Sequence, residues 1–436
     1  MILKNVRRFK PCLADRIRAA VDTFMKEGRG EDLVLFVRLG ADVNGLFVAP
    51  LKELGRETEG MFAETALHFA ARNGSLSAVL RLLSLGASLE RKGSWDLTPL
   101  MAACGGGGGG QADVIRALLY AGAKLEAVDA RGGTALWQAS YGGRSEIVQI
   151  LLEGKMKANV NAADQKGASA LMLACQMGHV EVVSLLVQEE ADVHTVSQDG
   201  GTALMMASKH GHNGIVTFLL NSGALHDVRA RNGWTALTFA CSQGHDDIAK
   251  ILLSKAPQLV DVGDQSTGFT PLMLACHHGH TAVVKTLLAA QASVNQTTVT
   301  GEAVTALHAA SRQGHPECVK ALLGAGAQVD VATQALGATP LMWASRLGRA
   351  DVVQILLEAK ADVNLTAVNG MTSLMWACEN NHADVVEVLL RFQANVDVAA
   401  NNGKTALCFA SDSHATQIAQ ILKSVRIDTP AGEKTI

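Results

Sequence analysis

One short stretch of the sequence, Cys276-His277-His278-Gly279-His280, contains residue types that could bind a metal ion. Thiolate and imidazole groups are common zinc ligands, and a structural zinc site uses four of them, usually as two pairs. No second pair of ligands at a zinc-like spacing accompanies this stretch. We therefore expect no metal site, while a metal protein or enzyme centred on residues 276–280 stays a competing hypothesis.

Other catalytic or nucleotide-binding patterns lack their required context. Gly105–Gly110 is a run of six glycines, but no strand precedes it and no Lys-Ser or Lys-Thr follows it, so a phosphate-binding loop is not indicated. The patterns Gly-x-Ser-x-Gly and His-Glu-x-x-His do not occur. We expect an expanded turn at the glycines, no catalytic residues, no cofactor and no enzymatic activity.

Composition excludes several further classes. The 436 residues are 48% hydrophobic and 18% charged, which is too apolar for a disordered chain. No apolar run reaches the length of about 18 residues that a transmembrane helix needs, so we expect no membrane insertion. The formal net charge of −3 lacks the basic excess of a general nucleic-acid binder.

An internal repeat defines the elements that must position the candidate residues. The phrase Thr-(Ala/Pro)-Leu-Met-x-Ala-(Ala/Ser/Cys), with variants, returns about every 33 residues, eleven times in all. Its copies begin at Thr65, Thr98, Thr134, Ser169, Thr202, Thr235, Thr270, Thr305, Thr339, Thr372 and Thr405.

Each unit predicts two helices. The hydroxyl of the Thr can cap the first helix, and Pro99, Pro271 and Pro340 fall at the next position, where a missing N–H costs nothing. Glycines such as Gly279 and Gly314 end that helix, and a second run with apolar residues at i, i+3 and i+4 follows. Neither helix can bury its apolar face alone, so neighbouring units must stack.

The segment from Thr305 to His315 resembles the ankyrin-repeat family almost letter for letter, and similar copies cover residues 60–424. One regular departure is that the His of the family's Thr-Pro-Leu-His phrase survives at His68 and His308 but is usually Met, as in Met342. The resemblance implies an all-α fold: a curved solenoid of stacked helix-turn-helix units joined by hairpin turns.

Four segments are expected along the chain. Residues 1–44 hold a basic start and a degenerate capping repeat, and residues 45–60 a loop insertion. Residues 61–424 hold eleven repeats, the last of them a polar cap, and residues 425–436 form a tail.

The eight cysteines are expected to be reduced residues of the core. Five of them stand six residues after the first residue of a copy, where they replace Ala or Ser in the core: Cys104, Cys175, Cys241, Cys276 and Cys378. Adjacent helix layers lie about 8–10 Å apart, which is beyond the usual reach of a disulfide. This favours an intracellular protein, in the cytoplasm or the nucleus.

In the family that the sequence resembles, partners usually bind the concave face, formed by the hairpin tips and the first helices. Two kinds of position are expected to project there. One is the residue before each Thr, and the other is the pair of residues that follows the Ala, Ser or Cys at the end of the repeated phrase. Two adjacent copies place Trp234 and Phe269 before the Thr, where most copies have small or polar residues. Aromatic, Arg and His side chains together are typical of interface hot spots. The expected binding residues are Arg231, Trp234, Gln243, Phe269, His277 and His278, with a weaker extension at Arg346, Leu347 and Met371.

The competing interpretation is that Trp234 and Phe269 pack on one another and only stiffen the stack. Trp343 and Trp376 occupy a slot filled elsewhere by Leu and Met and are assigned to the core.

These observations favour a monomeric, non-catalytic intracellular scaffold or adaptor that binds one or more partner proteins and no nucleic acid. A targeting or regulatory subunit of an enzyme complex, and an effector secreted by a pathogen or symbiont, are the alternatives.

Overall fold

The computed structural model describes residues 19, 23, 42–50, 61–106, 110–154, 157–299 and 302–428. The chain divides into two compact units. The first comprises Met1–Ala207 and Phe218–Ala224, and the second Ser208–Thr217 and Leu225–Ile436, so the division falls inside one repeat. Most of the expected N-terminal segment 1–44 lies outside the described residues.

The described part of the first unit begins with a two-stranded antiparallel sheet, β1 (Phe47–Pro50) and β2 (Met61–Glu64), in which Phe47 pairs with Glu64. Helix pairs follow. Their members are α4 (Ala66–Arg72), α5 (Leu76–Ser84), α6 (Pro99–Cys104), α7 (Gln111–Tyr120), α8 (Ala135–Tyr141), α9 (Ser145–Leu152), α10 (Ala170–Met177) and α11 (Val180–Gln188). A short 3₁₀ helix, η2 (Ser94–Asp96), lies between α5 and α6. Helices α12 (Ala203–His210) and α13 (Asn213–Asn221) span the division.

The second unit continues the same alternation. Its helices are α14 (Ala236–Gln243), α15 (Asp246–Lys255), α16 (Pro271–His278), α17 (Thr281–Ala289), α18 (Ala306–Gln313), α19 (Pro316–Gly324), α20 (Pro340–Arg346), α21 (Ala350–Glu358), α22 (Ser373–Glu379), α23 (Ala383–Arg391), α24 (Ala406–Asp412) and α25 (Thr416–Asp428), with the 3₁₀ helix η3 (Pro257–Leu259) after α15. Along this unit each first helix packs on the next, as α16 does on α18 and α20 on α22. The predicted all-α repeat solenoid is confirmed.

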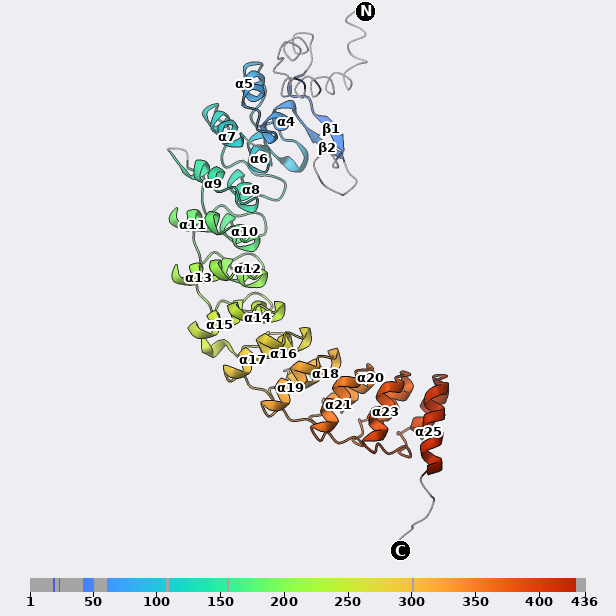
Figure 1. Cartoon of the computed structure of the whole chain (residues 1–436). Helices are drawn as coiled ribbons and strands as arrows, with labels where there is room; N and C mark the ends of the chain where they lie inside the picture. The colour runs from blue at the N-terminus through green and yellow to red at the C-terminus, as the bar shows by residue number, and fades with distance from the viewer. Residues whose placement is uncertain are drawn as a thin grey trace, which may run out of the picture. The chain divides into compact units, whose positions relative to one another are not determined.

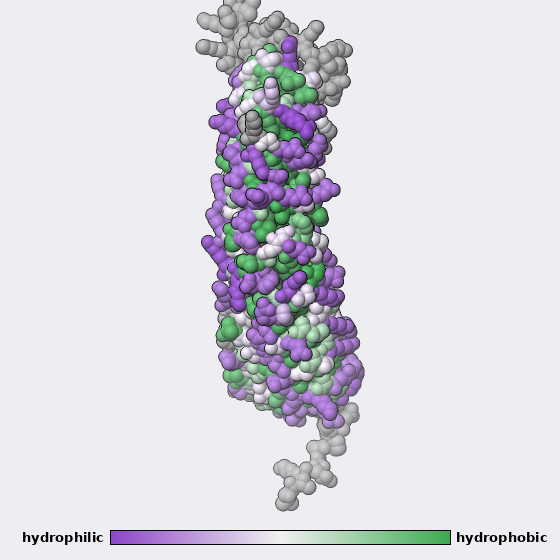
Figure 2. All heavy atoms as spheres, turned by 90° about the vertical axis from the view of Figure 1, so that its left-hand side faces the viewer, coloured by the Kyte–Doolittle hydropathy of each residue, from purple (hydrophilic) through white to green (hydrophobic). Residues whose placement is uncertain are grey.

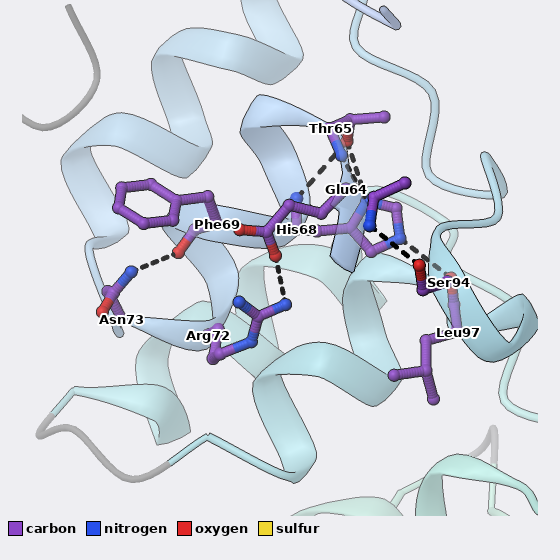
Figure 3. Close-up of polar contacts among 9 residues, drawn as sticks. Glu64, Thr65, His68, Phe69, Arg72, Asn73, Ser94 and Leu97 are labelled. Carbon is purple, nitrogen blue, oxygen red and sulfur yellow. Dashed lines mark hydrogen bonds and ion pairs between the residues drawn. The ribbon is translucent and has the colours of Figure 1, made fainter. Parts of the chain in front are cut away.

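The first residue of each copy begins its helix as the sequence predicts. The hydroxyl oxygen accepts a hydrogen bond from the backbone N–H three residues later in every copy except that of Thr405. Where the residue three positions after the Thr is a His, its ring makes further contacts. The Nδ1 of His68 lies 2.8 Å from the Thr65 hydroxyl, and its Nε2 lies 2.8 Å from the Leu97 carbonyl oxygen (Figure 3). This imidazole therefore ties one repeat to the hairpin turn of the next.

Three expectations need correction. The segment 45–60, expected to be a loop, contains strand β1, because its residues 47–50 pair with 61–64. The segment 425–436, expected to be a tail, begins with the last turn of α25, since the helix continues to Asp428. Cys408 is exposed rather than in the core, because it lies on α24, the first helix of the last repeat that the structure describes, whereas the other described cysteines are buried.

In several repeats, the glycine that ends the first helix lies against a His ring of the next repeat. Gly279 has a φ of 77°, the left-handed conformation that glycine adopts most easily. The ring of His315, from the next repeat, lies against it, and its Nε2 is 3.2 Å from the carbonyl oxygen of His277. The same His-to-carbonyl contact, at 3.0–3.2 Å, recurs at His179, His245, His280 and His382.

We expect Gly279→Ala to lower the free energy of unfolding by about 2 kcal/mol, from left-handed strain and steric overlap together. A Cβ at this position would lie 2.6 Å from ring atoms of His315. Gly326→Ala is the matched control, since Gly326 has a φ of 83° but nothing within 4 Å of an added Cβ. It should cost only about 1 kcal/mol, the strain alone. Urea denaturation of both variants measures the difference, and equal losses would contradict the His contact.

Candidate protein-binding surface

The first helices of the repeats in the second unit lie together on one side of the stacked repeats. In Figure 1, α14, α16, α18 and α20 lie on the inner side of the curve that these repeats follow, and α15, α17, α19 and α21 lie on its outer side. We call the surface made by α14, α16, α18, α20 and α22, with the turns that precede them, the first-helix face. All nine sequence-predicted binding residues belong to these helices, to the turns that precede them or to the residues that follow them.

Trp234 is half-buried, and its ring contacts its own repeat rather than Phe269. The ring packs edge-on against Phe239 of α14, with 5.0 Å between centroids. The Nζ of Lys209 lies over the Phe239 ring, 6.0 Å from its centroid. Within the described residues no ring contact joins Trp234 to Phe269, so the stacking alternative is not what the structure shows.

Phe269 and His277 line a cavity of about 260 Å³ between neighbouring repeats, which Val304, Arg312 and Trp343 also border. The side-chain amide of Gln313 lies 3.3 Å from the His277 ring. Burial first, and then the positive charges of His278, Arg312 and His315, lower the pKa of His277. The cavity thus combines an apolar wall with one cation, Arg312, and one carboxylate, Glu302.

Met371 was expected to be exposed, but its side chain is only 7% exposed. Its sulfur accepts a hydrogen bond of 3.1 Å from the indole Nε1 of Trp376, on the helix that this turn precedes. The residue before the Thr therefore folds back over the residue five positions later, as Trp234 does over Phe239. Met371 is part of the packing under this surface and is removed from the binding residues.

Trp343 also departs from its assignment, since it is half-buried rather than in the core. Trp376 is 4% exposed, as expected of a core residue, and its ring centroid lies 6.2 Å from that of Trp343. The guanidinium of Arg346 lies 5.6 Å from both ring centroids, and that of Arg312 lies 4.9 Å from the centroid of Trp343. An Arg-Trp-Arg-Trp stack therefore crosses α18, α20 and α22.

The remaining predicted residues are exposed. Arg231 lies on the turn that Trp234 closes, and Gln243 ends α14. His278 ends α16, with its Nδ1 2.9 Å from the carbonyl oxygen of Leu274. Leu347 follows α20 and is 39% exposed.

The Cys276–His280 stretch does not converge on a point. The Cys276 thiol is buried, which raises its pKa, while His277 and His278 meet edge to face with centroids 5.0 Å apart. Within the part of the chain that the structure describes, no three His, Cys, Asp or Glu side chains are grouped as metal ligands.

The first unit carries a larger cavity, about 510 Å³, lined by Trp95, Trp137 and Tyr141 among others. Trp95 has a φ of 58°, a left-handed conformation that is costly for a tryptophan. The rings of Trp137 and Tyr141 stack with centroids 5.9 Å apart. The buried carboxylate of Asp129 accepts a hydrogen bond from the side chain of Gln138 at the same cavity.

The second helices present a different surface. Figure 2 shows the side on which α7, α9 and α11 lie in Figure 1, where polar side chains predominate and apolar ones occur in small groups. Exposed apolar residues of second helices, such as Leu80 and Val180, are dispersed along the chain. Isolated apolar side chains of this kind are normal on a soluble surface.

The sequence analysis missed Phe239, Arg312 and the exposed part of Trp343. A signal for them exists, because Phe239 and Trp343 stand four residues after the first residue of their copies, and Lys209 and Arg312 stand seven residues after that of the preceding copy. A cation seven residues after the first residue of one copy, together with an aromatic residue four residues after the first residue of the next copy, predicts the observed contacts of Lys209 with Phe239 and of Arg312 with Trp343.

Comparison with a model of a known protein family agrees with this architecture. The family described as "Ankyrin repeats (3 copies)" matches residues 41–129, 67–164, 109–197, 136–230, 204–298, 294–367 and 360–431. Among solved structures, the human ASB11 ankyrin repeat domain is similar, with 29% sequence identity, a match that covers 52% of this chain and 97% of that domain, and a TM-score of 0.46. Ankyrin repeats are general protein–protein interaction modules. The chain belongs to the ankyrin repeat family.

Proposed function

We propose that this chain is a non-catalytic scaffold or adaptor that binds a partner protein on the first-helix face of its second unit. The observation that carries the proposal is the half-buried ring of Trp343, which lies between Arg312 and Arg346 at the edge of a cavity. Trp and Arg are the residues most enriched in interface hot spots. A stack of repeats also presents this surface preformed, which reduces the entropy lost on binding.

The adaptor role needs a second surface, and the cavity lined by Trp95, Trp137 and Tyr141 supplies a candidate on the first unit. The buried, unpaired cysteines support an intracellular setting, in the cytoplasm or the nucleus. No helix in the described part of the chain has both the length and the apolar character needed to span a bilayer. We propose that the protein acts as a monomer, with proteins as its partners.

The test is affinity capture from native lysate with the wild type, Trp343→Leu and Tyr120→Leu. Leucine occupies the Trp343 slot in other copies, at Leu173 and Leu274, so Trp343→Leu should fold normally. Tyr120 ends α7, on a second helix of the first unit, and is 96% exposed. It therefore provides a control for the loss of a surface aromatic ring.

We expect Trp343→Leu to weaken retention of the main partner at least about tenfold, as hot-spot losses do, with an unchanged unfolding midpoint. Tyr120→Leu should retain that partner. Identical partners for all three proteins would refute the assignment of the surface. A stoichiometric enzyme among the partners would favour the alternative of a targeting or regulatory subunit.

A further inference from the structure

The Arg-Trp-Arg-Trp stack fixes two positive charges on the first-helix face. Arg312 lies in the last turn of α18 and Arg346 ends α20, and each guanidinium lies over a tryptophan ring of the following copy, Trp343 or Trp376. Arg346 also contacts Trp343, so that ring is shared by both guanidiniums. Stacking on the rings restricts the long side chains before any partner arrives, so less entropy is lost when they bind an anion.

Neither guanidinium has an anionic partner in the part of the chain that the structure describes: no carboxylate lies within 4.0 Å and no hydrogen bond is made. Elsewhere a charged residue at the equivalent position is paired with the residue that precedes the first residue of its copy, as Arg72 is with Glu64 and Asp412 with Lys404. Two exposed arginines near one ring repel each other, and a carboxylate from outside would relieve that repulsion. Each retains five N–H donors in a geometry that matches a carboxylate.

The sign of the charge changes along the row to which these arginines belong. In the second unit, the residue that stands seven positions after the first residue of each copy is Lys209, Ser242, His277, Arg312 and Arg346, and then Glu379 and Asp412. The cationic part of the row therefore ends at α20. An anionic partner segment should follow α18 and α20 and avoid α22 and α24.

The cavity beside Arg312 complements these charges with an apolar site. Phe269, Val304 and Trp343 form apolar parts of its lining, and Glu302 provides the one carboxylate in it. Its volume of about 260 Å³ suits one side chain of a partner rather than a separate small molecule.

Building on the proposed function, we propose that the segment recognised by this surface is acidic. An extended stretch of the partner protein places carboxylates on Arg312 and Arg346 and an apolar side chain in the cavity. Successive helix layers lie about 8–10 Å apart and an extended chain rises about 3.3 Å per residue. The two carboxylates therefore stand about two to three residues apart.

The probe is a 12-residue peptide of repeated Glu-Glu-Leu-Gly, compared with a Gln-Gln-Leu-Gly peptide of equal length, by calorimetry and intrinsic tryptophan fluorescence at 50 mM salt. We expect the Glu peptide to bind the full chain at least about tenfold more tightly than the Gln peptide, with an affinity that falls as salt is raised. The double variant Arg312→Gln/Arg346→Gln should remove most of this difference. Arg346→Lys should retain part of it, because it keeps the charge but loses the planar stack.

Arg391→Gln is the matched control, since Arg391 is exposed on the second helix α23 and its loss changes the net charge equally per residue. Equal binding of the two peptides, or equal losses in the Arg312/Arg346 and Arg391 variants, would overturn the proposal. Preference for a 12-residue oligothymidine over the Glu peptide would overturn it in favour of nucleic acid. The proposed function is judged separately: a partner lost from Trp343→Leu but retained by the arginine variant would preserve that function and reject the acidic segment.

Discussion

Leu356→Ala should lower the free energy of unfolding by about 3–5 kcal/mol, the range for fully buried leucines that leave a cavity. Leu356 lies on α21 with 0% of its surface exposed. The residue at this slot of the second helix is leucine in all eleven copies, and every one is 0–1% exposed: Leu82, Leu118, Leu151, Leu186, Leu219, Leu252, Leu287, Leu322, Leu356, Leu389 and Leu422. The side chain is thus the centre of each inter-repeat contact, where neighbouring residues cannot collapse to fill the space.

Leu80→Ala is the control, because Leu80 also lies on a second helix, α5, but is 52% exposed. It should change the free energy of unfolding by no more than about 0.5 kcal/mol. Urea denaturation followed by circular dichroism measures both variants, and the first transition is the one to compare because repeats can unfold separately. Similar losses in the two variants would contradict the assignment of the buried face.

The sequence predicts the repeats well because their signals are local and occur many times. Three of these signals act within one helix: the Thr cap, the Pro at the first helical position and the glycine at the end. They can therefore be recognised in the sequence without knowledge of the tertiary structure. Eleven copies also separate what stacking requires from what varies. The β1–β2 hairpin was missed because it pairs a segment outside the repeat pattern with residues just before Thr65, and no second copy reveals it.

The binding surface was predicted only in part, for a physical reason. Position in the repeat shows that Met371 and Trp234 lie on turns, but whether they extend outward depends on rotamers and on the residue five positions later. Trp376 draws Met371 inward through its indole N–H, and Phe239 gives Trp234 a ring to pack on. The contact of Arg312 with Trp343 lies between copies, so it appears only when consecutive repeats are placed in register.

The second large effect concerns His308, one of the two histidines that keep the position filled by Met in most copies. Its Nδ1 lies 2.9 Å from the Thr305 hydroxyl and its Nε2 lies 3.2 Å from the Ala338 carbonyl. The backbone N–H of Thr305 also donates to Nδ1, so Nε2 carries the proton of the neutral ring. Burial lowers the pKa of His308 to about 4, although the hydrogen bonds to Ala338 and Val331 oppose this shift.

This pKa makes stability depend on pH in a defined direction. Above pH 6.5, the ordinary histidine pKa, the ring is neutral in both states and the full stability is present. Between pH 6.5 and about 4 the unfolded chain binds a proton that the folded chain excludes, so the free energy of unfolding decreases as the pH is lowered. The total loss is about 3 kcal/mol, since a tenfold change in proton affinity is worth about 1.4 kcal/mol. The carboxyl group of Asp264 does not act in this window. Although burial opposes it, hydrogen bonds from Thr267, Ser266 and Phe269 hold the pKa of Asp264 at about 2.

His308→Met should remove the part of this dependence that His308 contributes, because Met cannot be protonated and already occupies the same slot at Met273 and Met342. His68, whose pKa burial likewise lowers to about 4, contributes equally in the wild type and in the variant. Urea denaturation at pH 8 and pH 5 should show the wild type losing about 2 kcal/mol more than the variant over that interval. At pH 8 the variant should be slightly less stable, since two hydrogen bonds of about 1 kcal/mol each are lost while apolar packing is kept. If His308→Met and the wild type lose the same stability between pH 8 and pH 5, the buried neutral imidazole is not the source of the effect.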